Sequence, residues 1–341
     1  MNRTYALGLA VVTVLAGLVS AAHAQTRTLD TVRQKGILGC GVSTGVAGFS
    51  NPDDKGNWTG FDVDFCRAVS AAIFNDPNKV TYKPLTPKER FTALQSGEVD
   101  ILSRTTTWTI SRDSAMGLAF AGIMYYDGQG FMVKKALGVK SAKELNGATI
   151  CVQTGTTTEL NLSDFFRTNN LQYKPVVFEK ADEAIAAYDS GRCDAYTTDA
   201  SSLYAQRLKM KSPADNIVLP DIISKEPLGP VVRQGDFQWF TLVKWVYYAL
   251  LNAEELGVTQ KNVGQMAGST NPEIKRLLGA EGDFGKGLGL ENDWVVRIVK
   301  HMGNFAEIYD RNLGEGSPIK IDRGINKLWN AGGLQYAPPI R

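Results

Sequence analysis

Histidine is almost absent from this sequence, which contains two in 341 residues. Only His301 lies beyond the N-terminal segment, and a solitary histidine is usually solvated or structural. A pair of histidines at metal-ligand spacing is therefore missing, and no Ser-His-Asp set is recognisable. No glycine-rich loop ends in Gly-Lys-Ser or Gly-Lys-Thr, which excludes a P-loop. We expect no catalytic residue, no metal site and no cofactor.

Cysteine is also scarce, with four in the chain and no C-x-x-C spacing. Redox catalysis and a zinc site are therefore both weakly supported. Four cysteines allow three pairings, of which we favour Cys40 with Cys66 and Cys151 with Cys193. Each of these pairs joins elements that should pack as neighbours. Four unpaired structural thiols are the alternative.

Neither sign of charge is in excess. Arg3 is the one charged residue among the first 24, and without it the chain has 36 basic and 35 acidic residues. This balance argues against a nucleic-acid partner, which needs a basic face. The remaining 317 residues exceed what one compact core usually covers, so two lobes are expected.

The N-terminal residues 1–24 have the pattern of a cleavable secretory signal. Arg3 precedes an uncharged apolar run over residues 6–19, which is too short to span a bilayer. Ala22-His23-Ala24 then forms an A-x-A cleavage site before Gln25. A retained anchor is the alternative. The first cysteine is Cys40, so lipid attachment is not expected, and no later segment resembles a membrane span. We expect a soluble protein outside the cytoplasm.

Strand and helix patterns alternate along the chain. Residues 37–42 are strand-like, and residues 61–69 repeat large apolar side chains every four positions, which is helical spacing. A further helix is predicted from Thr86, with Pro87 at its first position and Glu89 completing a capping box. Residues 99–102 form the next strand. The alternation is typical of an α/β fold.

An internal repeat links two parts of the chain. Residues 93–102 and 187–196 share Ala, Ser, Gly and Asp at equal spacing, and both are predicted as helix end, glycine cap and buried strand. Coincidence of a common helix-to-strand turn is the alternative. If the repeat is real, two similar lobes each place a strand end at a shared cleft, where ligands of open α/β sheets bind.

The segments after the two matches are the candidate site. Arg104, Thr105, Thr107 and Arg112 follow the first match, and Asp199 follows the second. A lone arginine or aspartate after a strand is more often a surface salt-bridge partner. Their combination across two lobes favours a ligand that carries both charges.

A third segment, residues 151–159, is predicted as strand, glycine turn and helix start. Thr156 and Glu159 would form a capping box, which leaves backbone amides of Thr157 and its neighbours to bind a carboxylate. An α-carboxylate then fits Arg112 and amides near Thr107 and Thr157. An α-ammonium fits the Asp199 carboxylate and the Thr105 hydroxyl.

At these positions the chain resembles the periplasmic amino-acid-binding proteins of polar amino-acid ABC importers, which form solute-binding protein family 3. The residues that carry the resemblance are 60–64, 96–100, 109–112, 152–157 and 191–199. Within that family the chain is similar to the general L-amino-acid-binding variant of Gram-negative bacteria. That similarity rests on residues 48–54, 106–109, 225–230 and 336–341.

The resemblance implies roles for matching positions. Thr105, Thr107 and Arg112 match positions that hold the ligand's α-carboxylate and ammonium, Thr157 matches the helix-start amide donor, and Asp199 matches the acid that takes the ammonium. Val46, Arg104 and Gln153 are the expected contacts of the ligand's side chain. Two of them, Val46 and Arg104, depart from the family pattern.

Val46 stands where the family often places an aromatic ring, and Arg104 where a small polar residue is common. Loss of the ring puts a tailored aromatic or cationic specificity in doubt. Arg104 favours acidic ligands such as glutamate or aspartate, with a structural salt bridge at the cleft rim as the alternative.

The implied fold is a two-lobed periplasmic binding protein of type II with two chain crossings. Lobe 1 would comprise residues 25–129 and 231–341, and lobe 2 residues 133–227, with hinges near 130–134 and 228–233. In the C-terminal part, residues 293–309 are predicted as one amphipathic helix that packs on lobe 1.

The implied function is delivery of free L-amino acids to the membrane permease of an ABC transporter, with lobe closure on the ligand and a monomeric protein. Two other classes compete with this binding function. One is a periplasmic lyase or dehydratase on the same fold, and the other is an amino-acid sensor domain.

Overall fold

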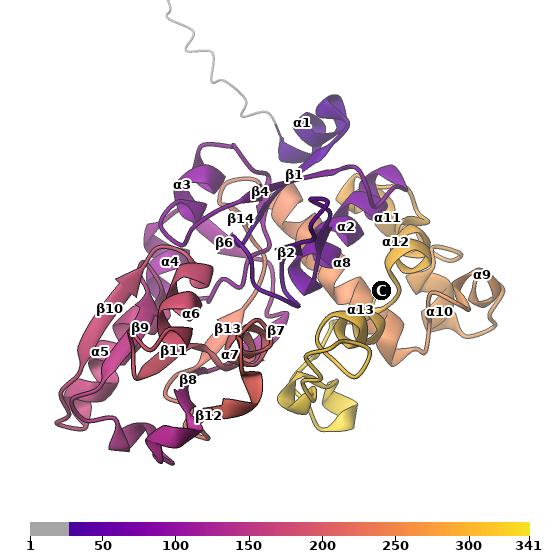
Figure 1. Ribbon diagram of the computed structural model, residues 1–341. Coiled ribbons are helices and arrows are strands. Elements are labelled where there is room, and N and C mark those ends of the chain that lie inside the picture. Colours follow the sequence, from indigo (N-terminus) through magenta and orange to yellow (C-terminus); the bar gives the residue numbers. More distant parts are fainter. Residues whose placement is uncertain (1–26) are drawn as a thin grey trace, which may run out of the picture.

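The computed structural model describes residues 27–341 and places two five-stranded sheets side by side, each with helices packed against it (Figure 1). The predicted secretory signal and its cleavage site lie outside the described residues. The strand order is β4-β1-β5-β14-β6 in the first sheet and β10-β9-β11-β8-β12 in the second.

Both sheets have the same mixed pattern. In the first, β1 is parallel to β4 and β5, while β14 is antiparallel to β5 and β6. In the second, β9 is parallel to β10 and β11, while β8 is antiparallel to β11 and β12. The strands of the first sheet are β1 (Leu38–Val42), β4 (Val80–Pro84), β5 (Ile101–Leu102), β6 (Leu118–Phe120) and β14 (Val231–Arg233). Those of the second are β8 (Gln129–Lys134), β9 (Thr149–Gln153), β10 (Lys174–Phe178), β11 (Ala195–Asp199) and β12 (Asn216–Val218).

Helices cover both sheets, and the C-terminal helices enlarge the half of the molecule that is built on the first sheet. The helices of the N-terminal part are α1 (Thr28–Lys35), α2 (Phe61–Phe74), α3 (Arg90–Gln95) and α4 (Ile110–Ala115). The second sheet is packed by α5 (Thr157–Thr168), α6 (Ala181–Asp189) and α7 (Ala200–Arg207). The C-terminal helices are α8 (Phe237–Glu255), α9 (Val263–Met266), α10 (Pro272–Leu277), α11 (Phe284–Leu288), α12 (Trp294–Met302) and α13 (Phe305–Asn312). Short 3-10 turns comprise Lys135–Leu137, Ala142–Glu144, Pro213–Asp215, Gly324–Asn326 and Trp329–Ala331.

The internal repeat corresponds to equivalent positions of the two sheets. Its two copies lead into β5 and β11, each the third strand in the order of its sheet. The repeated aspartates also make the same contact, because Asp100 accepts a hydrogen bond from the Gly39 amide (2.8 Å) and Asp194 from the Thr149 amide (2.7 Å). Each carboxylate therefore ties the third strand to the start of the second, which coincidence of a common turn does not explain.

Two short strands pair with one another between the sheets. They are β7 (Tyr125–Asp127) and β13 (Glu226–Leu228), and each continues into a strand of a neighbouring sheet (Figure 1). The predicted crossing at 130–134 lies inside β8 of the second sheet rather than between the sheets. A hinge is defined by two conformations, so the lobe boundaries stay a prediction. A separate hairpin pairs β2 (Asn51–Pro52) with β3 (Trp58–Thr59).

Two helix predictions are wrong in their bounds. Residues 293–309 form α12 and α13, with a break at Gly303, whose φ of 77° is left-handed. Asn304 and Glu307 then form a complete capping box that starts α13. The predicted capping box is present, since the Thr86 amide donates to the Glu89 carboxylate (3.0 Å) and the Glu89 amide donates to Oγ1 of Thr86 (3.4 Å), but these contacts close a turn and α3 begins only at Arg90. The apolar faces of α12 and α13 are buried against α2 and α8, as expected for packing on the first sheet's core.

The structure contains both predicted disulfides. Cys40 of β1 is bonded to Cys66 of α2, and Cys151 of β9 is bonded to Cys193, which lies two residues before the start of β11. No free cysteine is found among residues 27–341. Each bond therefore joins the second strand of its sheet to a neighbouring segment of the same half.

Removing the second disulfide should destabilise the half of the molecule built on the second sheet. It closes a loop with a sequence separation of 42, for which the chain-entropy model gives about 4 kcal/mol. In the Cys151→Ser, Cys193→Ser variant we expect faster hydrogen exchange of the β9 and β11 amides, with the first sheet unaffected. Equal protection of β9 and β11 in both proteins would show that the bond contributes no stability.

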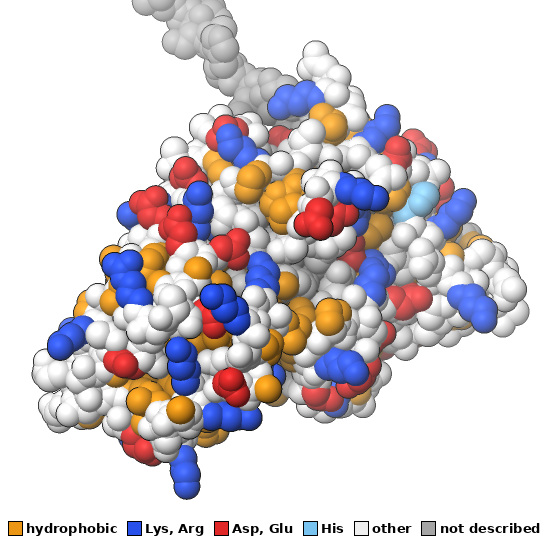
Figure 2. Space-filling view, viewed as in Figure 1, with side chains coloured by type: hydrophobic (Ala, Val, Ile, Leu, Met, Phe, Trp, Pro, Cys, Tyr) orange, Lys and Arg blue, Asp and Glu red, His pale blue; other side chains and the backbone are white. Residues whose placement is uncertain are grey.

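The surface carries mixed charge. Lysine and arginine side chains alternate with aspartate and glutamate over the face shown in Figure 2, which agrees with the balanced composition. Among the helices of residues 27–341, none is long and apolar enough to cross a membrane.

Candidate functional site

A small cavity lies between the two sheets. Strands β1, β5, β9 and β11 all end at it, and α5 and α7 begin there, so both halves contribute side chains. Its volume is about 40 Å³. Its lining is polar, and the residues are Ser43, Thr44, Val46, Pro87, Arg90, Arg104, Thr105, Thr107, Gln153, Thr156, Thr157, Thr158, Ala181, Tyr196, Thr198, Asp199, Ser202 and Gln206.

Seven of the eight ligand contacts predicted from the sequence line this cavity. They are Val46, Arg104, Thr105, Thr107, Gln153, Thr157 and Asp199. They come from segments as far apart in the sequence as Val46 and Asp199, and the parallel strands bring them to one edge. Arg112 is not among the lining residues.

Arg112 lies behind the cavity wall. It is buried, its guanidinium packs over the Phe91 ring (5.2 Å to the centroid), and its Nη1 donates to the Thr107 carbonyl (2.7 Å). Burial lowers its pKa, while Glu226 and Asp199 oppose that shift. Arg112 therefore fixes the backbone of a lining residue and brings positive charge close to the site.

The start of α5 faces the cavity with unused amides. Thr156 caps the helix by accepting from the Glu159 amide (3.0 Å). The Glu159 carboxylate accepts from the Gly155 amide (2.8 Å) rather than from that of Thr156, so the predicted capping box is shifted by one residue. No hydrogen bond from the Thr157 amide is found among residues 27–341. Helix-start amides of this kind bind carboxylates.

Gly155 also allows the two halves to approach. Its φ is 74°, and a Cβ there would lie 3.0 Å from Cγ of Lys88 in the other half. Nearby, Lys88 pairs with Glu179 (3.2 Å), and Lys209 donates to the Gly45 carbonyl (3.2 Å). These contacts join the half built on the first sheet to that built on the second, so the structure has the cleft closed.

Asp199 supplies negative charge to the cavity and lacks a protein donor. It is buried at the end of β11, and no hydrogen bond to its carboxylate is found within the described part of the chain. Burial raises its pKa well above the usual range, and the nearby carboxylates Asp127 and Glu226 raise it further. Burial likewise raises the pKa of Asp127 to about 6. The cluster therefore favours a cation.

Ligand affinity should depend on pH through this carboxylate. A bound ammonium stabilises the ionised form of Asp199, whose pKa is raised without ligand, so binding releases a proton below that pKa. We expect affinity to rise with pH through the range in which Asp199 of the ligand-free protein loses its proton, and then to level off. Calorimetry in buffers of different ionisation enthalpy measures the released proton. An affinity that falls over this range would contradict the assignment.

Sequence reasoning missed Arg90. It lines the cavity from the first turn of α3 and is 2% exposed. Its Nε has no hydrogen-bond partner among the described residues, and its Nη1 lies 3.5 Å from Oγ1 of Thr106. Burial lowers its pKa well below the usual range, with Arg104 and Arg112 adding to the shift. An unsatisfied buried guanidinium favours an anionic group in the cavity. Its position at the start of α3 carries no sequence signal that distinguishes it from a solvated arginine.

Arg104 is held in the wall rather than at a salt bridge. Its Nε donates to the Leu85 carbonyl (2.8 Å). No ion pair of Arg104 within 4 Å is found among residues 27–341, so the rim salt bridge considered from the sequence does not form there. Burial raises the pKa of Asp62 to about 7, against the opposing effects of the Thr105 amide and of Arg104. Asp62 accepts from the Thr105 amide (3.0 Å) and holds that residue at a left-handed φ of 38°.

Val46 and Gln153 occupy the positions predicted for side-chain selectivity. Val46 forms an isolated bridge with Ser50 and is buried. Gln153 donates from Nε2 to the Glu179 carbonyl (2.8 Å). An aliphatic side chain and a neutral amide here impose no charge on that part of the cavity.

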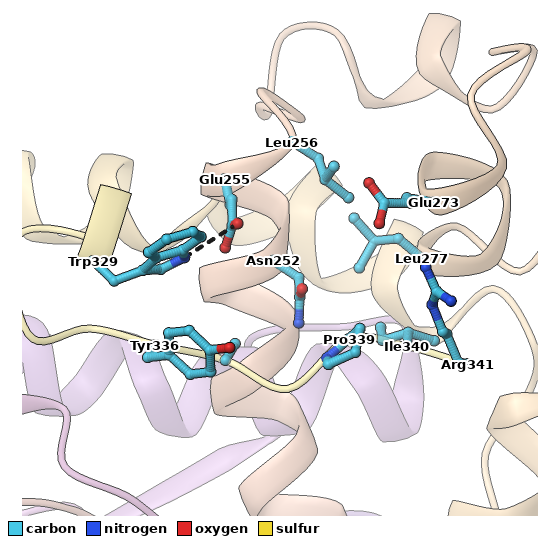
Figure 3. A pocket seen from close by; sticks show the side chains of 11 residues that line it. Asn252, Glu255, Leu256, Glu273, Leu277, Trp329, Tyr336, Pro339, Ile340 and Arg341 are labelled. Atoms are coloured by element: carbon cyan, nitrogen blue, oxygen red, sulfur yellow. Dashed lines mark hydrogen bonds between the residues drawn. The ribbon is translucent and has the colours of Figure 1, made fainter. Parts of the chain in front are cut away.

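A larger groove lies elsewhere, at the end of α8, with a volume of about 390 Å³. Trp329 and Tyr336 form one wall, and the Trp329 indole donates to Glu255 (3.2 Å), as Figure 3 shows. The C-terminal residues Ile340 and Arg341 form the opposite end. No cluster of three or more His, Cys, Asp or Glu suited to a metal is found in residues 27–341.

Comparison with known proteins gives consistent matches. Residues 38–263 match the model of the bacterial extracellular solute-binding proteins, family 3. The general L-amino acid-binding periplasmic protein of Rhizobium johnstonii is 63% identical over 325 residues, which cover 95% of each chain. The glutamate/glutamine/aspartate/asparagine-binding protein of Rhodobacter capsulatus is 55% identical over 328 residues, 96% of this chain and 97% of that one.

A solved structure is similarly close. The periplasmic binding protein of an ABC transporter from Brucella ovis, solved with glutathione bound, is 63% identical and superposes with a TM-score of 0.91. The match covers 92% of this chain and 99% of that chain.

Proposed function

Because this chain belongs to the bacterial extracellular solute-binding proteins of family 3, we propose that it is the periplasmic binding component of an ABC transporter for free L-amino acids. Its relatives are amino-acid-binding proteins rather than enzymes. Nothing in the comparisons favours the lyase or the sensor considered from the sequence. The protein delivers its ligand to membrane permease subunits.

The observation that carries the proposal is the charge arrangement of the cavity. On the second-sheet side, Asp199 is a buried carboxylate without a protein donor, and the start of α5 offers unused amides. On the first-sheet side, Arg90 is a buried guanidinium with an unpartnered Nε. A zwitterion neutralises both charges at once, whereas a purely anionic or cationic ligand neutralises one of them.

The ligand range is proposed to be broad with a preference for acidic and amide side chains. Arg90 and Arg104 give the cavity wall positive charge, while Val46 and Gln153 tolerate neutral groups. A thermal-shift screen against the twenty L-amino acids tests this range. A response confined to glutamate and aspartate would assign selectivity to the arginines, a wide response would assign the general function, and no response to any amino acid would contradict the proposal.

Glutathione is a second candidate ligand, because the 63% identical Brucella ovis protein was solved with it. Its γ-glutamyl end carries a free α-ammonium and α-carboxylate, which are the groups this cavity complements. A tripeptide needs more room than a free amino acid, so glutathione would bind a more open form of the cleft. Titration of glutathione in competition with L-glutamate distinguishes binding at a shared site from no binding of glutathione.

Three further proposals concern the whole protein. Residues 1–24 serve as a secretory signal that is cleaved after Ala24, and the mature protein acts as a monomer. Lobe 1 (25–129 and 231–341) and lobe 2 (133–227) close on the ligand, and the paired strands β7 and β13 are the connections that would bend. Small-angle scattering with and without L-glutamate tests the closure, since a ligand that binds the closed form better shifts the population toward it.

A further inference from the structure

Glu226 is a buried residue at the junction of the two halves. It lies on β13, the crossing strand, and is 1% exposed. Its Oε2 accepts from Oγ1 of Thr107 (2.6 Å) and from Oγ1 of Thr157 (2.8 Å). Its Oε1 accepts from Nδ2 of Asn161 (2.7 Å) and from Oγ of Ser224 (2.7 Å). One carboxylate therefore contacts hydroxyls from both sides of the cleft.

These contacts fix where the hydroxyl protons point. A threonine hydroxyl has a single proton to donate, and an ionised carboxylate only accepts. With both protons directed to Oε2 of Glu226, neither Thr107 nor Thr157 has a hydroxyl proton left for the cavity that both line. Their remaining lone pairs accept hydrogen bonds there. The 3.2 Å separation of the two hydroxyl oxygens places these lone pairs next to one another.

We propose that Glu226 is a positioning residue that makes the Thr107 and Thr157 hydroxyls hydrogen-bond acceptors for the ligand's ammonium group. This rests on the proposed amino-acid-binding function. The two hydroxyls then act together with Asp199, and the ligand's carboxylate is left to the α5 amides and the arginine side. Glu226 thereby sets which way round a zwitterion lies in the cleft, although it does not itself line the cavity.

The variant that tests this is Glu226→Gln, which preserves shape and removes the charge. A glutamine accepts through its oxygen but donates through its Nε2, so two of the four donors, either the two threonine hydroxyls or Asn161 and Ser224, lose their acceptor, and the oxygen that remains carries no full charge. We expect affinity for L-glutamine to fall about tenfold or more. Affinity for (S)-2-hydroxyglutaramate, which has a hydroxyl in place of the ammonium, should change much less. The ratio of the affinities for L-glutamine and for this analogue should therefore be smaller in the variant than in the wild type.

A second variant distinguishes a positioning role of Glu226 from a general disturbance of the folded structure. Thr107→Val removes one oriented hydroxyl directly, and adding Glu226→Gln to it should cost less than in the wild-type background, because the two changes act on the same interaction. Glu183→Gln, at an exposed glutamate of α6, is the matched control and should leave both affinities unchanged. Thermal unfolding without ligand checks that each variant folds.

The outcomes are distinguishable. Equal loss of affinity for both ligands, or additive effects of the two substitutions, would overturn the positioning role and assign Glu226 to lobe closure alone. Unchanged affinities in Glu226→Gln would overturn it as well. If the wild-type protein binds no amino acid, the proposed function itself fails, and that result is obtained before any variant is compared.

Discussion

Replacing Asp199 by asparagine is expected to weaken L-glutamate binding by about 3 kcal/mol, or roughly 100-fold. The side chain keeps its size and position at the end of β11, but the buried counter-charge of the ammonium is lost. Asparagine also relieves the repulsion from Asp127 and Glu226 that raises the pKa of Asp199. The unliganded variant should therefore unfold at an equal or higher temperature than the wild type.

This pairing of weaker binding with undiminished stability separates a ligand contact from a structural residue. Asp164→Asn is a suitable control, since Asp164 lies on the exposed face of α5 in an ion pair with Arg167. It should change neither property. A variant Asp199→Asn that binds L-glutamate as tightly as the wild type would remove Asp199 from the site.

The second large effect is expected for Arg112→Ala, which should cost about 3–5 kcal/mol of binding free energy. The guanidinium supports the Thr107 carbonyl and brings positive charge near Asp199 and Glu226. Without it, there is less positive charge near the ligand's carboxylate, and the Thr107 carbonyl loses its hydrogen bond from Arg112. Isothermal titration with L-glutamate and L-glutamine measures the loss.

A lysine at position 112 helps to divide these two contributions. Arg112→Lys retains the charge but not the planar group that packs over Phe91 and reaches Thr107. Near-complete recovery of affinity would favour a role through charge, and little recovery a role through geometry. Arg167→Ala, at an exposed arginine, is the control. Wild-type affinity in Arg112→Ala would show that the residue has no part in binding.

Much of the site was predictable because it follows strand ends. Asp199 ends a buried strand, Thr105, Thr107 and Thr157 lie within a few residues after one, and the edge shared by parallel strands brings them together. The repeated aspartates Asp100 and Asp194 marked the equivalent strands in the same way. The family resemblance supplied the roles that spacing alone did not.

Other residues could not be found by that reasoning. Arg90 is one residue of a helix start, and only its burial and its unpartnered Nε distinguish it from a solvated arginine. Glu226 acts through hydroxyls 119 and 69 residues away in sequence. The break at Gly303 was hidden because the apolar spacing of α12 and α13 continues through it, although Gly303 and the Asn304–Glu307 cap were visible in the sequence.

The central claim is that the cleft binds the α-ammonium and α-carboxylate that all amino acids share. Titration calorimetry of ligand-free protein with L-glutamate and with glutarate, which lacks the amino group, tests it most directly. We predict one L-glutamate bound per chain and at least about 100-fold weaker binding of glutarate. Equal affinity for the two compounds, or no binding of L-glutamate or any other L-amino acid, would contradict the account.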